Sequence, residues 1–113
     1  MEITERTIDE KTCVISLDGT LNARSADQVK ESFREVAGKG VEQVVLDLGD
    51  VPFIDSSGLA ALVSGLKTLN EHDGSLKLAS LQSQADLLFK LTMFDKVFEI
   101  YDDVDSAVKS FEL

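Results

Sequence analysis

Two adjacent serines lie in the part of the sequence best suited to regulatory chemistry, the run Asp55-Ser56-Ser57-Gly58-Leu59. This run follows a strand-like apolar segment and opens a predicted helix. The first turn of a helix presents unpaired N–H groups and a partial positive charge, which accommodate a phosphate. A phosphoserine there would add about −1.5 to −2 charges at pH 7 and change what can dock. Asp and Ser are also favoured capping residues, so a helix start alone is the alternative interpretation.

The residues around the serines are acidic and apolar. The nearby carboxylates belong to Asp47, Asp50 and Asp55. The apolar neighbours are Val51, Phe53 and Ile54. We expect Ile54 to belong to the core, whereas Phe53 or Val51 could contribute to an exposed contact patch. A phosphate at this position would therefore add to an acidic surface.

The sequence gives little support for an enzymatic function. It contains no GxxxxGK[ST], GxGxxG or GxSxG motif, and its one histidine and one cysteine, His72 and Cys13, do not make a usual zinc site. A catalytic triad would need His72 beside Ser57, but the predicted helix separates them by 15 residues, or about 22 Å. We expect His72 to be a surface residue and Cys13 a packing residue. The sequence predicts no catalytic residue, metal site or cofactor.

Strands alternate with helices after an initial hairpin. The predicted strands are residues 3–8, 12–17, 44–48, 76–79 and 97–100. Residues 9–11 are the polar turn of the hairpin. The strand 44–48 is almost continuously apolar, which is typical of a central strand buried on both faces. The closing strand, 97–100, is short.

Three helices are predicted between the strands, and a fourth closes the chain after the last strand. The first begins after Ser25, which we expect to cap it by accepting a backbone N–H bond, and ends at Gly38 and Gly40. The second runs from Ser57 to about residue 72. The third covers residues 85–91 with Leu87, Leu88 and Leu91 as its apolar positions. The last is marked by Val104, Ala107, Val108 and Phe111. The order ββαβαβαβα predicts an α/β fold with a mixed, mostly parallel sheet.

Length and charge limit which kinds of protein and partner are compatible with the sequence. A chain of 113 residues predicts one domain spanning 1–113, and 43% hydrophobic residues predict a globular one. The net charge of −10 disfavours nucleic acid and membrane surfaces as direct partners. A lone cysteine, a charged N-terminus and the lack of a long apolar run lead us to expect a cytoplasmic protein.

Three segments together resemble the STAS domain family, and more narrowly the bacterial anti-sigma factor antagonists. The first combines VVLDL at 44–48, Val51 and FIDSSGL at 53–59. The second is GTLNARSA at 19–26, where a strand ends in Gly-x-Leu and a helix begins. The third comprises LLFKLT at 87–92 and VFEIY at 97–101. The resemblance thus covers nearly the whole chain.

The resemblance implies a sheet of about five strands with four helices, mainly on one side, and a function in binding rather than catalysis. In this family the unphosphorylated protein binds an anti-sigma factor, itself a serine kinase, and so frees the sigma factor. The kinase uses its own ATP to phosphorylate the second serine of the motif, which is Ser57 here, and a phosphoserine phosphatase reverses this. The partner-binding residues that we expect are Asp55, Ser56, Gly58, Asn22, Ser25 and Phe53.

Two points stay open at this level. Asn22 stands where the family often has Asp, which keeps hydrogen bonding but removes a charge; a turn residue is its simpler interpretation. The alternative function is a STAS subunit of a membrane transport complex of the ABC type, which docks on the ATPase of that complex without phosphorylation of Ser57.

Overall fold

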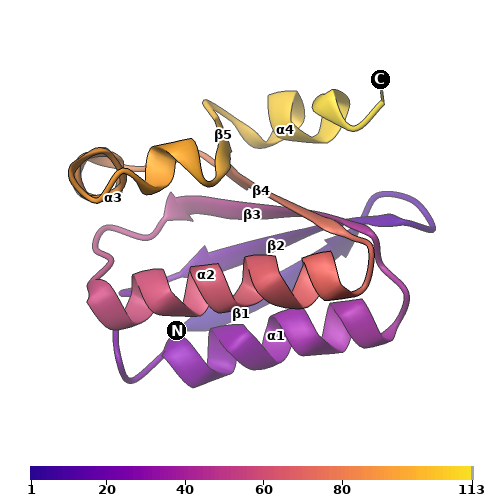
Figure 1. The fold of residues 1–113 in the computed structure, drawn as a ribbon, viewed down its shortest axis with the longest axis horizontal. Coiled ribbons are helices and arrows are strands. Elements are labelled where there is room, and N and C mark those ends of the chain that lie inside the picture. Colours follow the sequence, from indigo (N-terminus) through magenta and orange to yellow (C-terminus); the bar gives the residue numbers. More distant parts are fainter. Residues whose placement is uncertain (113) are drawn as a thin grey trace.

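The computed structural model describes residues 1–112 and contains five strands, four α-helices and one short 3-10 helix (Figure 1). The strands are β1 (Glu2–Thr7), β2 (Thr12–Asp18), β3 (Gln43–Asp50), β4 (Ser75–Ala79) and β5 (Glu99–Tyr101). The helices are α1 (Ala26–Gly38), α2 (Ser56–Glu71), α3 (Ser83–Leu91), η1 (Phe94–Lys96) and α4 (Val104–Ser110). Apart from η1, the order is the predicted ββαβαβαβα.

The five strands form one mixed sheet in sequence order, β1-β2-β3-β4-β5. β1 is antiparallel to β2, and the remaining neighbours are parallel. Ile15, Leu46, Leu78 and Ile100 lie next to one another across the four parallel strands. This arrangement confirms the predicted hairpin and the central position of β3, whose Val44, Val45, Leu46 and Leu48 are buried.

Most of the core lies between the sheet and the helices on one of its faces. α1 and α2 lie side by side there, as Figure 1 shows. Val29, Phe33 and Leu62 are among the side chains that fill this layer. Gly65 of α2 leaves room for the Phe33 ring of α1, because a Cβ at that position would overlap the ring. The close contact between the two helices fixes where α2 begins relative to the sheet.

α4 covers part of the opposite face with a second, smaller cluster. Ala107 packs against Val14, Val45 and Ala79. Lys77 is buried beneath this helix; its Nζ donates to Ser110 Oγ at 2.6 Å and lies 4.1 Å from the centre of the Phe111 ring. A hydrogen bond and a cation–π contact thus satisfy a charge that burial would otherwise disfavour.

Two segments near the C-terminus, α3 and the start of β5, differ from the sequence-based expectation. α3 buries Ala85 and Phe89, whereas the expected apolar positions Leu87 and Leu91 are 56% and 73% exposed and Leu88 is half-buried. Both stripes have helical spacing, but the Phe89 ring packs edge-to-face on Phe98 with their centres 5.6 Å apart. This contact is consistent with an orientation of α3 in which Leu87 and Leu91 face outward.

The last strand begins at Glu99 and not at residue 97. η1 occupies residues 94–96, and the N–H groups of Val97 and Phe98 both donate to the Phe94 carbonyl. Val97 therefore has a helical backbone and is 53% exposed, while Phe98 is buried. Pairing of β5 with β4 starts only after this turn.

Candidate functional site

The two loops that carry the predicted site residues lie side by side at the carboxyl ends of β2 and β3. The Leu21 N–H donates to the Phe53 carbonyl at 3.0 Å, and the Asp55 N–H donates to the Leu21 carbonyl at 3.1 Å. Leu21 and Ile54 form a parallel bridge, and both are fully buried. The β2–α1 loop therefore supports the β3–α2 loop just before the two serines.

Asp55 caps α2. Its backbone is extended, and its Oδ1 accepts the Gly58 N–H at 2.9 Å. Ser56 and Ser57 are the first two residues of this 16-residue helix; Ser56 is exposed and Ser57 half-buried. The first N–H groups of a helix have no intrahelical partner, and Asp55 satisfies only that of Gly58. The hydroxyls of both serines thus stand at the positive end of a long helix.

Gly58 lies against the main chain of Leu21. An added Cβ would lie 2.7 Å from Leu21 Cγ and nearer still to the Leu21 carbonyl oxygen. Only glycine permits this approach, so Gly58 sets how closely the start of α2 packs on the β2–α1 loop. Because Gly58 is buried, it acts through this packing and not as an exposed contact.

Ser25 differs from its expected role as the cap of α1. It precedes the helix, but its hydroxyl makes no capping bond to it. Instead, Ser25 Oγ donates to the Thr20 carbonyl at 2.8 Å and accepts the Asn22 N–H at 3.0 Å. The backbone of Ser25 is in the α region, and the side chain is turned back into its own loop. Ser25 is 5% exposed and therefore shapes the loop from inside.

Asn22 is a half-buried turn residue beside it. Its Oδ1 accepts the Arg24 N–H at 3.0 Å, and its carbonyl accepts the N–H groups of Ser25 and Ala26. The neutral amide is sufficient for this bond, so the local turn does not require a carboxylate at this position. Asn22 lies one residue from Leu21 and so belongs to the same supporting loop.

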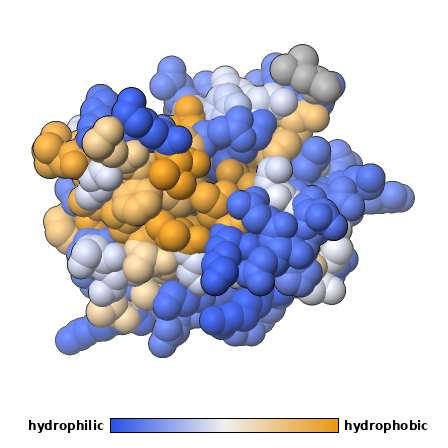
Figure 2. Space-filling view, in the orientation of Figure 1, coloured by the Kyte–Doolittle hydropathy of each residue, from blue (hydrophilic) through white to orange (hydrophobic). Residues whose placement is uncertain are grey.

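The surface around the serines has apolar parts. Phe53 is 47% exposed, while Val51 and Ile54 are fully buried, so Phe53 is the one of these three side chains that reaches the surface. On the other side, a groove of about 390 Å³ is lined by Ser56, Leu59, Ala60, Val63 and Phe94. Figure 2 shows an apolar region over the same part of the molecule, where α2 and α3 meet the surface. Polar serines and exposed apolar side chains thus share one surface.

The three aspartates near the serines in sequence do different things. Asp55 is the cap described above. Asp47 is half-buried in β3, where its two carboxylate oxygens accept from Gly49 N–H and Ser16 Oγ–H. Asp50 is exposed. Asp47 therefore stabilises the end of the sheet through hydrogen bonds, whereas Asp50 is an exposed carboxylate at the end of β3.

The other chemically interesting residues lie away from the serines. His72 is exposed at the far end of α2, with Nδ1 2.8 Å from the Thr68 carbonyl oxygen. Cys13 is buried in β2, and this burial raises the pKa of its thiol to about 11.

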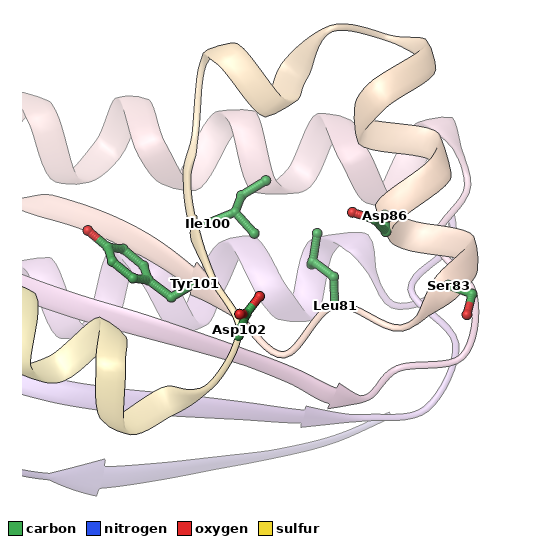
Figure 3. Close-up of a pocket in the computed structure, with 6 residues that line it drawn as sticks. All are labelled: Leu81, Ser83, Asp86, Ile100, Tyr101 and Asp102. Atoms are coloured by element: carbon green, nitrogen blue, oxygen red, sulfur yellow. The ribbon is translucent and has the colours of Figure 1, made fainter.

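A separate hollow at the carboxyl ends of β4 and β5 has Asp86 and Asp102 among its lining residues (Figure 3). Residues 1–112 contain no group of three or more His, Cys, Asp or Glu side chains that could hold a metal ion. Within the same residues, no helix is long and apolar enough to span a bilayer.

Fold and sequence define a protein class. The STAS domain family matches residues 3–107, so the chain belongs to that family. It is 29% identical over 99 residues to the BtrV protein of Bordetella bronchiseptica, covering 88% of this chain and 85% of BtrV. It is also 26% identical over 101 residues to the anti-sigma F factor antagonist of Paenibacillus polymyxa, covering 88% and 86% of the two chains.

Solved structures agree with this assignment. The crystal structure of the TM1081 protein of Thermotoga maritima superimposes with a TM-score of 0.91 at 27% identity, covering 98% of this chain and 95% of that one. Two neighbours at lower identity share the fold. They are the phosphorylated form of SpoIIAA from Bacillus, with a TM-score of 0.75 at 16% identity, and a sulfate transporter family protein of Wolinella succinogenes, with 0.81 at 18%. They cover 97% and 93% of this chain, and it covers 99% and 88% of theirs.

Sequence reasoning missed two contributors to the site. The Gly-x-Leu pattern included Leu21 without showing that its main chain bonds on both sides of Ile54. Gln84, at the start of α3, bonds to Ile54 from 30 residues away, and nothing in its local sequence indicates this.

Proposed function

We propose that this protein is an anti-sigma factor antagonist whose binding is switched by phosphorylation of Ser57. Membership of the STAS family and the names of its relatives support the first part. The observation that carries the second is the position of Ser57 as the second residue of α2, beside the cap Asp55 and the groove residue Ser56.

The chemistry of that position favours a switch that leaves the fold intact. The N-terminus of α2 tolerates a phosphate, so the modified helix need not unfold. The same phosphate adds about two negative charges next to exposed apolar surface, where docking removes water. An apolar partner surface that fits the unmodified site would then have to bury a dianion, and the complex would dissociate.

The partners follow from this scheme. In the unphosphorylated state the protein binds an anti-sigma factor that is also an ATP-dependent serine kinase, and a sigma factor is released. A separate phosphoserine phosphatase restores the binding state. Ser56, Asp55 and Phe53 contact the kinase or present Ser57 to it, while Asn22, Ser25 and Gly58 hold the two loops in place.

Phosphate mapping tests the proposal. The protein is incubated with ATP and a serine kinase of the anti-sigma factor class that co-purifies with it, and the product is analysed by mass spectrometry. We expect one phosphate, on Ser57, which is lost in Ser57→Ala and retained in the matched control Ser56→Ala. A phosphate on Ser56, or none from a kinase shown to be active, would contradict the switch.

A transport role is the second candidate, favoured by the fold shared with the Wolinella succinogenes transporter family protein. In that case the domain docks on the ATPase of a membrane transport complex, and Ser57 stays unmodified. Co-purification separates the two candidates, because the captured ATPase is either a small kinase or a transporter subunit. Ser57→Asp would weaken capture only in the first case.

A further inference from the structure

The backbone of Ile54 is held from two sides. Leu21 bonds to the residues before and after it, Phe53 and Asp55. The N–H and C=O of Ile54 itself point the other way, as alternate residues of an extended chain do. Among residues 1–112, no strand lies on that side of the loop: β4 ends at Ala79, and its register with β3 stops at Asp47. These two backbone groups therefore need another partner.

The side chain of Gln84 supplies that partner. Its Oε1 accepts the Ile54 N–H at 2.8 Å, and its Nε2 donates to the Ile54 carbonyl at 2.9 Å. A primary amide has the same donor and acceptor as a peptide group, so Gln84 completes the pairing that a neighbouring strand would provide. Ile54 is fully buried, and an unpaired backbone group there would be costly.

The rest of α3 keeps this amide in place. Ala85 and Phe89 anchor the helix in the core, and Gln84 immediately precedes Ala85. From Ile54 the chain passes through Asp55, the cap of α2, directly to the serines. The direction of the Ser57 hydroxyl thus depends on a backbone segment that α3 fixes through a single side chain.

We infer that Gln84 is a positioning residue for the serine motif: its amide clamps the Ile54 backbone and thereby sets how Ser57 is presented to the partner. The first half of this inference concerns the free protein, and the second rests on the proposed function. Gln84 touches neither serine and acts through Ile54 and Asp55.

Amide hydrogen exchange followed by NMR tests the clamp without any partner. Gln84→Met keeps the length and helix propensity of the side chain but makes neither bond. We expect the Ile54 amide to exchange about tenfold faster in this variant, while Val45 and Leu46 in β3 keep the wild-type rates. Gln84→Glu keeps an acceptor for the Ile54 N–H, and its exchange rate should lie between the two. Gln82→Met is the matched control, because Gln82 donates to the Gly49 carbonyl, outside the motif. An unchanged Ile54 rate, or equal acceleration at Val45 and Leu46, would overturn the clamp.

Phosphorylation kinetics test whether the Gln84 clamp affects how Ser57 is presented to the kinase. With the kinase described above, kcat/KM for Gln84→Met should fall by about tenfold, whereas that of Gln82→Met stays at the wild-type value. A wild-type kcat/KM in Gln84→Met, despite faster Ile54 exchange, would overturn the positioning role. If the wild-type protein itself is not phosphorylated, the proposed switch fails, and hydrogen exchange alone decides whether Gln84 clamps the loop.

Discussion

Gly58 and Leu21 are in direct contact: the first turn of α2 rests on the main chain of the β2–α1 loop, with no space for a side chain between them. The same Leu21 main chain bonds to Phe53 and Asp55. One residue of the first loop therefore fixes both the approach to the serine motif and the start of its helix. The two loops behave as one unit.

Gly58→Ala should destabilise the protein by about 1–3 kcal/mol, since the new methyl group overlaps the Leu21 backbone and forces α2 away. Gly38→Ala is the matched control at the exposed end of α1, where an added Cβ meets nothing within 4 Å. It should leave stability unchanged or raise it by less than about 1 kcal/mol. Urea unfolding measures both. A Gly58→Ala variant as stable as the wild-type protein, or more stable, would contradict the packing role of Gly58 and leave only the gain in helix propensity.

Ser57→Asp should weaken binding to the anti-sigma factor by at least about tenfold, because it adds a charge at the docking surface. Ser57→Ala should bind with wild-type affinity but resist the switch when ATP is added. Titration calorimetry with a non-hydrolysable ATP analogue compares the two. Equal affinities for Ser57→Asp and Ser57→Ala would exclude a charge switch at this residue.

Asp55→Ala should lower the free energy of unfolding by about 1 kcal/mol, because the Gly58 N–H loses its acceptor. Asp55→Asn keeps an oxygen at the same place and should restore most of that loss. Thermal unfolding of the three proteins gives the comparison. If Asn is as damaging as Ala, the negative charge at the helix N-terminus, and not the hydrogen bond, is what Asp55 contributes.

Stability should fall as the pH rises from about 9 to 11. Burial, with a smaller contribution from the Glu5 charge, raises the pKa of the Cys13 thiol from its ordinary 9.0 to about 11. The unfolded chain therefore releases this proton before the folded chain does, which favours unfolding over that window by up to about 2 kcal/mol. Urea unfolding at pH 8, 9.5 and 11 should show a shallower decline in Cys13→Ala. Parallel declines in the two proteins would assign the effect to other groups.

Local pattern was sufficient to predict the elements but not their contacts. The apolar run in β3 and the Asp-Ser signal before α2 follow from periodicity and capping, and both were found where expected. α3 carries two apolar stripes of the same spacing, so only the contact between Phe89 and Phe98 selects the buried one. Ser25 satisfies a carbonyl in its own loop, an alternative that every capping serine has.

The contacts that hold the candidate site in place could not be predicted from the sequence, for a related reason. Gln84 and Ile54 are 30 positions apart and meet through a side-chain amide and a main chain, a pairing that leaves no periodic trace. Leu21 likewise acts through its backbone, which any residue type except proline would provide. The identity of the motif is therefore visible in the sequence, whereas the geometry that holds it is not.

The strand order β1-β2-β3-β4-β5 also bears on how the protein is made. Every strand pairs with its predecessor in the chain, so the sheet can grow in one direction as the polypeptide leaves the ribosome. β2, α1, β3 and α2 can assemble the serine motif once residue 71 has emerged, but the Gln84 amide arrives later. In the nascent chain the loop that leads into the serines would therefore be loosely fixed until α3 docks, and only the finished protein would offer the serines to a kinase in a defined geometry.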